Sequence, residues 1–139
     1  MATRLQVLID LNVILDVLQR REPFFAASTQ VLASAETGQI EGWIAAHSVT
    51  TLFYLLAKDR SAQLARVAIS DLLTILSVAA VDQAVIEQAL SLPYDDFEDA
   101  VQMMAAARLG ADYLVSRNVA NYKEGPLPVL QPAELLALL

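Results

Sequence analysis

The sequence contains no cysteine and only one histidine, one tryptophan and four glycines among its 139 residues. The absence of cysteine excludes disulfides, thiol catalysis and cysteine-ligated zinc, and it agrees with a reducing compartment. The scarcity of glycine leaves no glycine-rich loop that could cradle a nucleotide phosphate. The chemistry of this chain must therefore come from carboxylates, hydroxyls, amides and the single imidazole of His47.

Long hydrophobic runs are absent as well. No apolar run approaches the roughly 20 residues that a membrane-spanning helix needs, and the N-terminus lacks the order of basic, apolar and small residues of a signal peptide. We therefore expect a cytoplasmic protein without membrane contact. Hydrophobic residues still make up 56% of the chain and charged residues only 18%. This composition predicts a single domain over residues 1–139, with part of the apolar excess on a partner surface.

Basic residues are few, with nine Lys and Arg against 16 Asp and Glu and a formal net charge of −7. This balance argues against a general electrostatic attraction to nucleic acid, because phosphate contacts need a basic face. A local basic rim would have to come from Arg20, Arg21, Lys58 and Arg60, which follow two expected helices. Helix ends also attract cations for structural reasons. Both interpretations of these residues stay open.

The most informative segment covers residues 5–18. The apolar residues 5–9 are typical of a buried parallel strand, and apolar residues at helical spacing follow directly. Asp10 therefore lies at the carboxyl end of a strand, where open α/β sheets place their chemistry. Asp10 and Asn12 could instead cap the following helix, since both side chains accept hydrogen bonds from free helical amides.

A second acidic segment comes just before a long apolar helical stretch. Asp95, Asp96, Glu98 and Asp99 place four carboxylates in five positions, and such crowding is costly unless a cation or solvent relieves it. A favourable interaction with a helix dipole explains one or two of these acids, but explains all four less readily. If Asp96 and Asp99 are both helical, they share one face of the helix and Glu98 points elsewhere.

The remaining periodicity completes an α/β pattern. Strands are predicted over residues 5–9, 40–46, 74–78, 113–115 and 127–130. Helices are predicted after Asp10, over 24–37, from Ser48 or Thr50 to Ala57, over 63–73 and 82–90, from the acidic segment to Leu109, and from Pro132. Strands that alternate with helices imply a parallel sheet covered on both faces. We predict a three-layer α/β/α fold with a central parallel sheet of four to five strands.

In their order and spacing, these blocks resemble the PIN domain family of metal-dependent ribonucleases. The resemblance begins with the D-x-N-x-x-x-D pattern of Asp10, Asn12 and Asp16, and it continues with Asp99 at the head of a helix. It extends to residues 113–118, where the family has a strand followed by T-R-D or T-R-N, and to a last strand over 127–130. The D-F-E-D-A and S-R-N blocks are most similar to a bacterial subgroup of toxin-like ribonucleases related to VapC-type toxins.

The resemblance implies an endoribonuclease that uses Mg²⁺ or Mn²⁺, because phosphodiester hydrolysis needs an activated water and neutralisation of developing charge. It implies that Asp10 and Asp99 hold the metal. Asp96 is expected as an auxiliary ligand and Asn118 as a further catalytic residue. The residues expected to bind substrate are Asn12, Ser116 and Arg117. The implied partners are an RNA substrate, an antitoxin protein and a second copy of the chain in a homodimer.

Two positions depart from the family pattern. The third helix carries Tyr54 or an apolar neighbour where a Glu is expected, and no carboxylate follows before Asp59. Asn118 stands where many members have Asp, and its amide oxygen can orient a water but carries no charge. The departures favour an alternative, a catalytically impaired PIN-like domain that binds RNA or protein. A phosphatase is a third possibility with less support, because Asn12 stands where such enzymes commonly have a second Asp.

Three other residues have competing structural roles. His47 has no identifiable Ser or Cys partner and lies next to an expected helix start, so we favour a structural role for it. Asp16 is interpreted as a structural or solvent-facing acid rather than a metal ligand. Arg117 could contact a phosphate or form an ion pair with a nearby carboxylate.

Overall fold

The computed structural model describes residues 4–139. Its strands are β1 (Leu5–Ile9), β2 (Ile40–Ala45), β3 (Ser77–Ala79), β4 (Tyr113–Val115) and β5 (Val129–Leu130). Its helices are α1 (Leu11–Leu18), α2 (Phe25–Glu36), α3 (Ala46–Asp59), α4 (Ala62–Leu72), α5 (Gln83–Ala89), α6 (Phe97–Leu109) and α7 (Pro132–Leu136), with a short 3₁₀-helix η1 (Val119–Tyr122). Within this part of the chain, no helix is both long and apolar enough to cross a bilayer.

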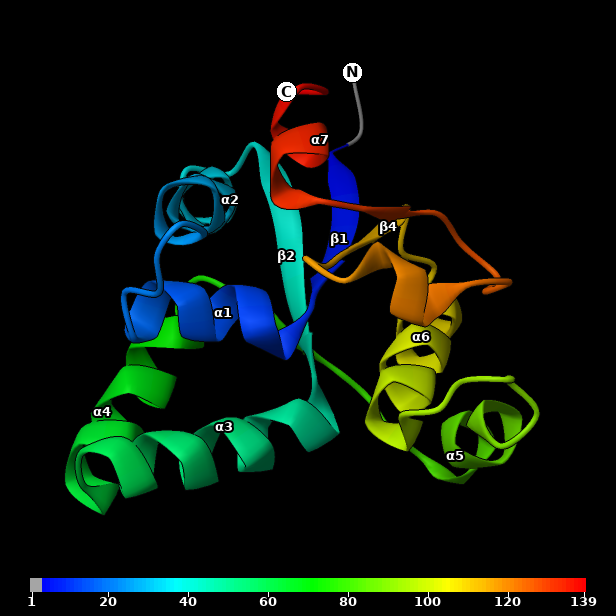
Figure 1. Ribbon diagram of the computed structural model, residues 1–139, viewed down its shortest axis with the longest axis horizontal. Coiled ribbons are helices and arrows are strands. Elements are labelled where there is room, and N and C mark those ends of the chain that lie inside the picture. The colour runs from blue at the N-terminus through cyan, green and yellow to red at the C-terminus, as the bar shows by residue number, and fades with distance from the viewer. Residues whose placement is uncertain (1–3) are drawn as a thin grey trace.

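The strands form one parallel sheet in the order β3-β2-β1-β4-β5. The central strand β1 is buried on both faces, which explains its uninterrupted apolar sequence. Side chains alternate between the two faces of a strand. Val7 and Ile9 thus pack with helices α1 to α4 and α7, whereas Leu8 packs with α5 and α6. Figure 1 shows α1 to α4 on one side of the sheet and α5 and α6 on the other. The predicted three-layer fold is confirmed, with five strands.

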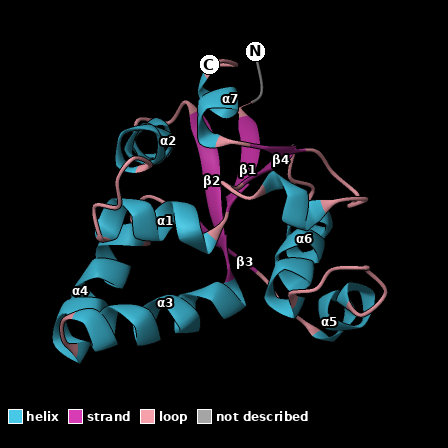
Figure 2. Ribbon diagram, in the orientation of Figure 1, coloured by secondary structure: helices cyan, strands magenta, loops and turns pink. Residues whose placement is uncertain are grey.

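The order of the strands defines where a site can form. From β1 the chain moves outward through β2 to β3, and it then returns to the other side of β1 as β4. The connections therefore diverge at the carboxyl ends of β1 and β4, and such a switch point leaves a crevice in a parallel sheet. In Figure 2 the strands run between the two layers of helices, and α1 begins directly at the end of β1. Asp10 lies in this connection.

Several element boundaries differ from the prediction, among them β5, which covers Val129–Leu130 rather than 127–130. Two further differences concern the start of α3 and the bounds of β3. Helix α3 begins at Ala46, directly after β2, and Ala45 provides no side-chain cap, so the predicted start at Ser48 or Thr50 is wrong. Strand β3 covers Ser77–Ala79 rather than 74–78, because the backbone after α4 first turns through hydrogen bonds from Thr74 and Ile75. Continuity of the backbone and pairing with β2 decide both boundaries, which local sequence signals do not record.

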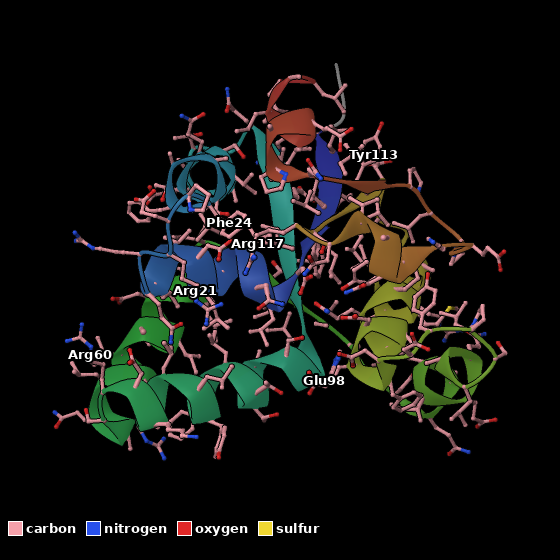
Figure 3. All side chains as sticks on the ribbon, viewed as in Figure 1. Arg21, Phe24, Arg60, Glu98, Tyr113 and Arg117 are labelled. Atoms are coloured by element: carbon pink, nitrogen blue, oxygen red, sulfur yellow. The ribbon has the colours of Figure 1, made fainter. Side chains whose placement is uncertain are left out.

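A buried ion pair connects α1 to the segment after β4. The Asp16 side chain is fully buried, and its Oδ2 atom lies 2.9 Å from Arg117 Nε and accepts a hydrogen bond from Ser28 Oγ at 3.2 Å. Burial raises the pKa of Asp16, and the Arg117 charge opposes that shift. The Arg117 guanidinium also stacks 4.0 Å from the ring centre of Phe24 (Figure 3). From the sequence, Asp16 is interpreted as either a structural or a solvent-facing acid. The structure shows that it is structural and does not face solvent.

We expect Arg117→Met to lower the free energy of unfolding by about 3 kcal/mol, because it leaves the Asp16 carboxylate buried without its cation. Urea unfolding measures this loss. Arg108→Met is the matched control, since the Arg108 ion pair with Asp82 is exposed at 3.9 Å and should contribute less than about 1 kcal/mol. Similar small losses in both variants would contradict a stabilising role for the buried pair.

Candidate functional site

The candidate site begins where β1 and β4 end side by side. Ile9 pairs with Val115, and the Asp10 amide continues the ladder by donating to the Val115 carbonyl at 2.9 Å. The next side chains meet directly, because Ser116 Oγ donates to Asp10 Oδ2 at 2.7 Å. Both side chains are buried, with 3% of Asp10 and none of Ser116 exposed. The register of the two strands therefore places Asp10 in the crevice.

Four donors surround the Asp10 carboxylate. Its Oδ1 atom accepts from the backbone amide of Asn12 and from Gln102 Nε2, each at 3.3 Å. Its Oδ2 atom accepts from Ser116 Oγ at 2.7 Å and lies 3.2 Å from Tyr122 Oη. Each carboxylate oxygen has about two acceptor positions, so these contacts use all of them. The capping interpretation of Asp10 also holds, since its side chain accepts from the first turn of α1.

Asp99 reaches the same point through the Tyr122 hydroxyl. Tyr122 Oη lies 3.0 Å from Asp99 Oδ1, and it accepts from Gln102 Nε2 at 3.1 Å. The two carboxylates thus come from the end of β1 and the first turn of α6, and both lie within 3.2 Å of one hydroxyl oxygen. The structure brings together the two acids that the resemblance implied as metal ligands.

The electrostatics of this cluster favour a bound proton or cation. Partial burial raises the pKa of Asp99 to about 6, the Tyr122 hydrogen bond opposes the shift, and the charges of Asp96, Asp10 and Glu98 add to it. Burial and the two carboxylates raise the pKa of Tyr122, so its hydroxyl stays protonated. One hydroxyl proton serves one carboxylate at a time. Protonated Asp99 would therefore donate to Tyr122 while Tyr122 donates to Asp10.

The other acids of the cluster lie around Asp99 without joining the network. Asp96 caps α6 by accepting from the Glu98 amide at 2.9 Å, so it is not helical, and the shared face with Asp99 that we considered does not form. Asp96 and Asp99 instead line an open cavity of about 390 Å³. Glu98 turns toward α3, where Thr51 Oγ1 donates to its carboxylate at 3.0 Å. The role of Asp96 as a ligand stays a prediction.

Helix α3 contacts this acidic cluster through its first turns. His47 Nε2 lies 3.1 Å from the Glu98 carbonyl oxygen, which is a contact with backbone. Tyr54, the position aligned with the expected Glu, is 63% exposed. Figure 3 places Glu98 between the beginnings of α3 and α6. The carboxylate nearest the start of α3 therefore comes from the neighbouring helix.

Sequence reasoning missed two residues of the network, Gln102 and Tyr122. Gln102 is 2% exposed on a helix face that is otherwise apolar, and this isolated polar residue was a signal that could have identified it. Tyr122 lies in η1 and carried no comparable signal. Of the remaining predicted residues, one lies near the Asp10 carboxylate and the other lies away from it. The backbone N–H of Asn118 donates to Ser116 Oγ at 3.0 Å, next to Asp10, whereas Arg117 pairs with Asp16.

The possible metal ligands in this site are of the right chemical type for a hard divalent cation, since Mg²⁺ and Mn²⁺ prefer carboxylate and amide oxygens. Besides the two carboxylates, Gln102 Oε1 is buried and lacks a hydrogen-bond partner. Within residues 4–139, however, no three acidic or imidazole side chains lie close enough to form a metal-binding group. The hydroxyl of Tyr122 lies between the Asp10 and Asp99 carboxylates, within hydrogen-bond distance of both.

Comparison with known proteins identifies the family. A family model described as a PIN domain matches residues 6–120, which is most of the chain. The chain therefore belongs to the PIN domain family. A comparison with curated protein sequences finds no match.

Several solved structures share the fold. FitAcB from Neisseria gonorrhoeae superposes with a TM-score of 0.70 and 17% identity over 91% of this chain and 98% of that one. A toxin–antitoxin complex from Klebsiella pneumoniae gives 0.68 and 20%, over 91% and 97%. VapC20 of Mycobacterium tuberculosis, described as a toxin that cleaves the sarcin–ricin loop, gives 0.63 and 17%, over 78% and 86%. At these identities the likeness is one of fold.

We expect the free energy of unfolding to fall as the pH rises from the ordinary Asp pKa of 3.8 to about 6. In this range the folded state keeps a proton on Asp99 that the unfolded state has lost. Because the carboxyl is only half-buried, the effect should be on the order of 1 kcal/mol. Urea unfolding at about pH 4 and about pH 7 measures it.

Asp99→Asn is the control for this pH dependence. Asp16 also has a raised pKa and adds a dependence of the same sign, which the comparison of the two proteins subtracts. Over the same pH range, the free energy of unfolding of Asp99→Asn should fall by less than that of the wild type. An identical decrease in both proteins would show that Asp99 does not carry a raised pKa.

Proposed function

We propose that this PIN domain protein is a divalent-metal-dependent endoribonuclease with Asp10 and Asp99 as its principal metal ligands. One observation carries the proposal: these two carboxylates, far apart in the sequence, meet at a buried point at the carboxyl edge of the parallel sheet. Two neighbouring carboxylates, one buried and one half-buried, favour a cation that binds both.

The residues around the pair have separate roles in the proposed reaction. A bound Mg²⁺ or Mn²⁺ would supply charge neutralisation and an activated water for phosphodiester hydrolysis. Ser116 and Gln102 hold the Asp10 carboxylate in one orientation through their hydrogen bonds. Asn118 lies next to Ser116, and its side-chain amide would orient a water. Asp96 would add negative charge from the open cavity it shares with Asp99.

An RNA substrate fits the distribution of charge better than the net charge suggests. Lys123 lines the cavity beside Asp99. Arg20, Arg21 and Arg60 together line a second depression of about 390 Å³, near the opposite end of α3 from Glu98 (Figure 3). Helix α3 has 14 residues, which corresponds to about 20 Å. A single strand of several nucleotides would span this distance, with phosphates at the basic end.

An antitoxin partner is part of the proposal. The structure from Klebsiella pneumoniae is described as a toxin–antitoxin complex. This chain has an apolar groove of about 550 Å³ between its helices, and Leu18, Leu32, Leu64 and Ile75 are among the residues that line it. Leu64 is 55% exposed. A homodimer and a cytoplasmic location stay predictions from the sequence.

A second candidate function has a specific observation in its favour. Every acceptor position of Asp10 already has a donor, and α3 contributes no carboxylate to the pair. These features favour a PIN-like domain that binds RNA or protein without cleaving it. Metal-dependent cleavage by the purified protein separates the two functions.

We expect purified protein to cleave a mixed RNA pool with Mn²⁺, to stop when EDTA is added, and to lose at least about 100-fold in rate as Asp10→Asn. Gel analysis of the RNA measures the rate. Asp71→Asn is the matched control, because it makes the same change in charge on the exposed surface of α4. Cleavage that survives in Asp10→Asn, or no cleavage by the wild type, would favour the binding function.

A further inference from the structure

Tyr122 occupies the position that joins the two proposed ligands. Its side chain is 3% exposed, and its hydroxyl lies 3.2 Å from Asp10 Oδ2 and 3.0 Å from Asp99 Oδ1. A cation that binds Asp10 must displace one of the four donors to its carboxylate, because a donor and a cation compete for the same lone pair. The question is which of the donors to Asp10 can leave.

Three of the four donors are anchored in the framework of the domain. The Asn12 amide belongs to the backbone of α1, and Ser116 follows β4 and is fully buried. Gln102 lies in the middle of α6 and is 2% exposed. Tyr122 alone comes from η1, a 3₁₀-helix of four residues in the connection between β4 and β5. Its withdrawal would break no strand pairing, but it would remove the ring from the core that Tyr122 shares with Leu114 and Met103.

We propose that Tyr122 closes the carboxylate pair against divalent cations, and that Mg²⁺ or Mn²⁺ gains Asp10 and Asp99 together only when this side chain withdraws. The inference rests on the proposed function, because it concerns access to the same metal site. In this proposal the 3₁₀-helix η1 acts as a gate, and the structure shows the gate closed, with the Tyr122 hydroxyl between the two carboxylates.

Packing outside the carboxylates supports the closed position. The rings of Tyr122 and Tyr94 meet edge to face, with centres 5.9 Å apart. The same connection approaches α6 closely at Gly125, where an added Cβ would lie 2.5 Å from Met103 Cε and from Tyr94 Oη. The closed position of Tyr122 is thus held by an aromatic contact and by a glycine that permits close approach.

Gln102 links the closed position to the proposed metal site. Its Nε2 atom donates both to Asp10 and to Tyr122, while its Oε1 atom is buried without a hydrogen-bond partner among residues 4–139. An unpaired buried amide oxygen costs free energy. It is also a type of ligand that Mg²⁺ and Mn²⁺ accept. The closed network therefore leaves unsatisfied an atom that a cation could satisfy.

We expect Tyr122→Phe to bind Mn²⁺ roughly tenfold or more tightly than the wild type, because the cation no longer has to replace hydrogen bonds to the carboxylates. Calorimetric titration measures the Kd, and thermal unfolding with and without Mn²⁺ should show a larger increase in Tm for the variant. Without metal, the variant should melt at a lower temperature than the wild type.

Tyr94→Phe is the matched control. It removes a neighbouring buried tyrosine hydroxyl that has no hydrogen-bond partner among the described residues, and it leaves the hydroxyl between the carboxylates in place. Its Kd for Mn²⁺ should equal that of the wild type. Equal tightening in both phenylalanine variants would overturn the inference, because it would assign the effect to the loss of any buried hydroxyl nearby rather than to the one between the carboxylates.

A measurement on the wild-type protein does not depend on the folding of any variant. With ¹³C in the tyrosine rings, titration with Mg²⁺ should move the NMR signal of Tyr122 toward that of a less buried ring. The signal of Tyr54, which is 63% exposed on α3, should stay unchanged. A Tyr122 signal that does not move while Mg²⁺ binds would overturn the inference.

The outcomes separate the gate from the nuclease. An unchanged or weaker Kd in Tyr122→Phe, together with RNA cleavage by the wild type, would overturn the gate and leave the proposed function standing. Tighter Mn²⁺ binding by the variant without any cleavage would support the gate and overturn the nuclease. No Mn²⁺ binding by either protein would overturn both.

Discussion

The burial of the Asp10 carboxylate is the constraint on which the rest of the site depends. A carboxylate with 3% exposure is costly unless donors surround it. Those donors come from the start of α1, the end of β4, the middle of α6 and the 3₁₀-helix η1. Three of these segments lie about 90 to 110 residues from Asp10 in the chain, and the parallel sheet serves to bring them to it.

The domain compensates its two buried N-terminal acids in different ways. Asp16 has a full positive charge beside it, because Arg117 Nε lies 2.9 Å away. Asp10 has only neutral donors in its hydrogen bonds, and its nearest charged partner in the network is a second acid, Asp99. The first arrangement cancels the charge and stabilises the fold. The second leaves negative charge in the crevice, which suits a site that binds a cation.

The acids around Asp99 place negative charge beside the start of α3. Helix α3 has no carboxylate near its start, but Glu98 extends from α6 to Thr51 and places one there. Asp96 keeps to the other side, in the open cavity. Burial is the main reason that the pKa of Asp99 rises to about 6, and the negative charge of the neighbouring acids adds to the shift.

Local signals in the sequence determined the strands, the position of Asp10 at a strand end and the acids at the head of α6, because apolar runs and capping patterns act over a few residues. Tertiary structure decided the rest. The partner of Asp16, the capping role of Asp96 and the start of α3 depend on which segments meet in space. The contacts of Gln102 and Tyr122 with Asp10 join residues about 90 and 110 positions apart. No local pattern records such contacts, since the sheet order that creates them is a property of the whole domain.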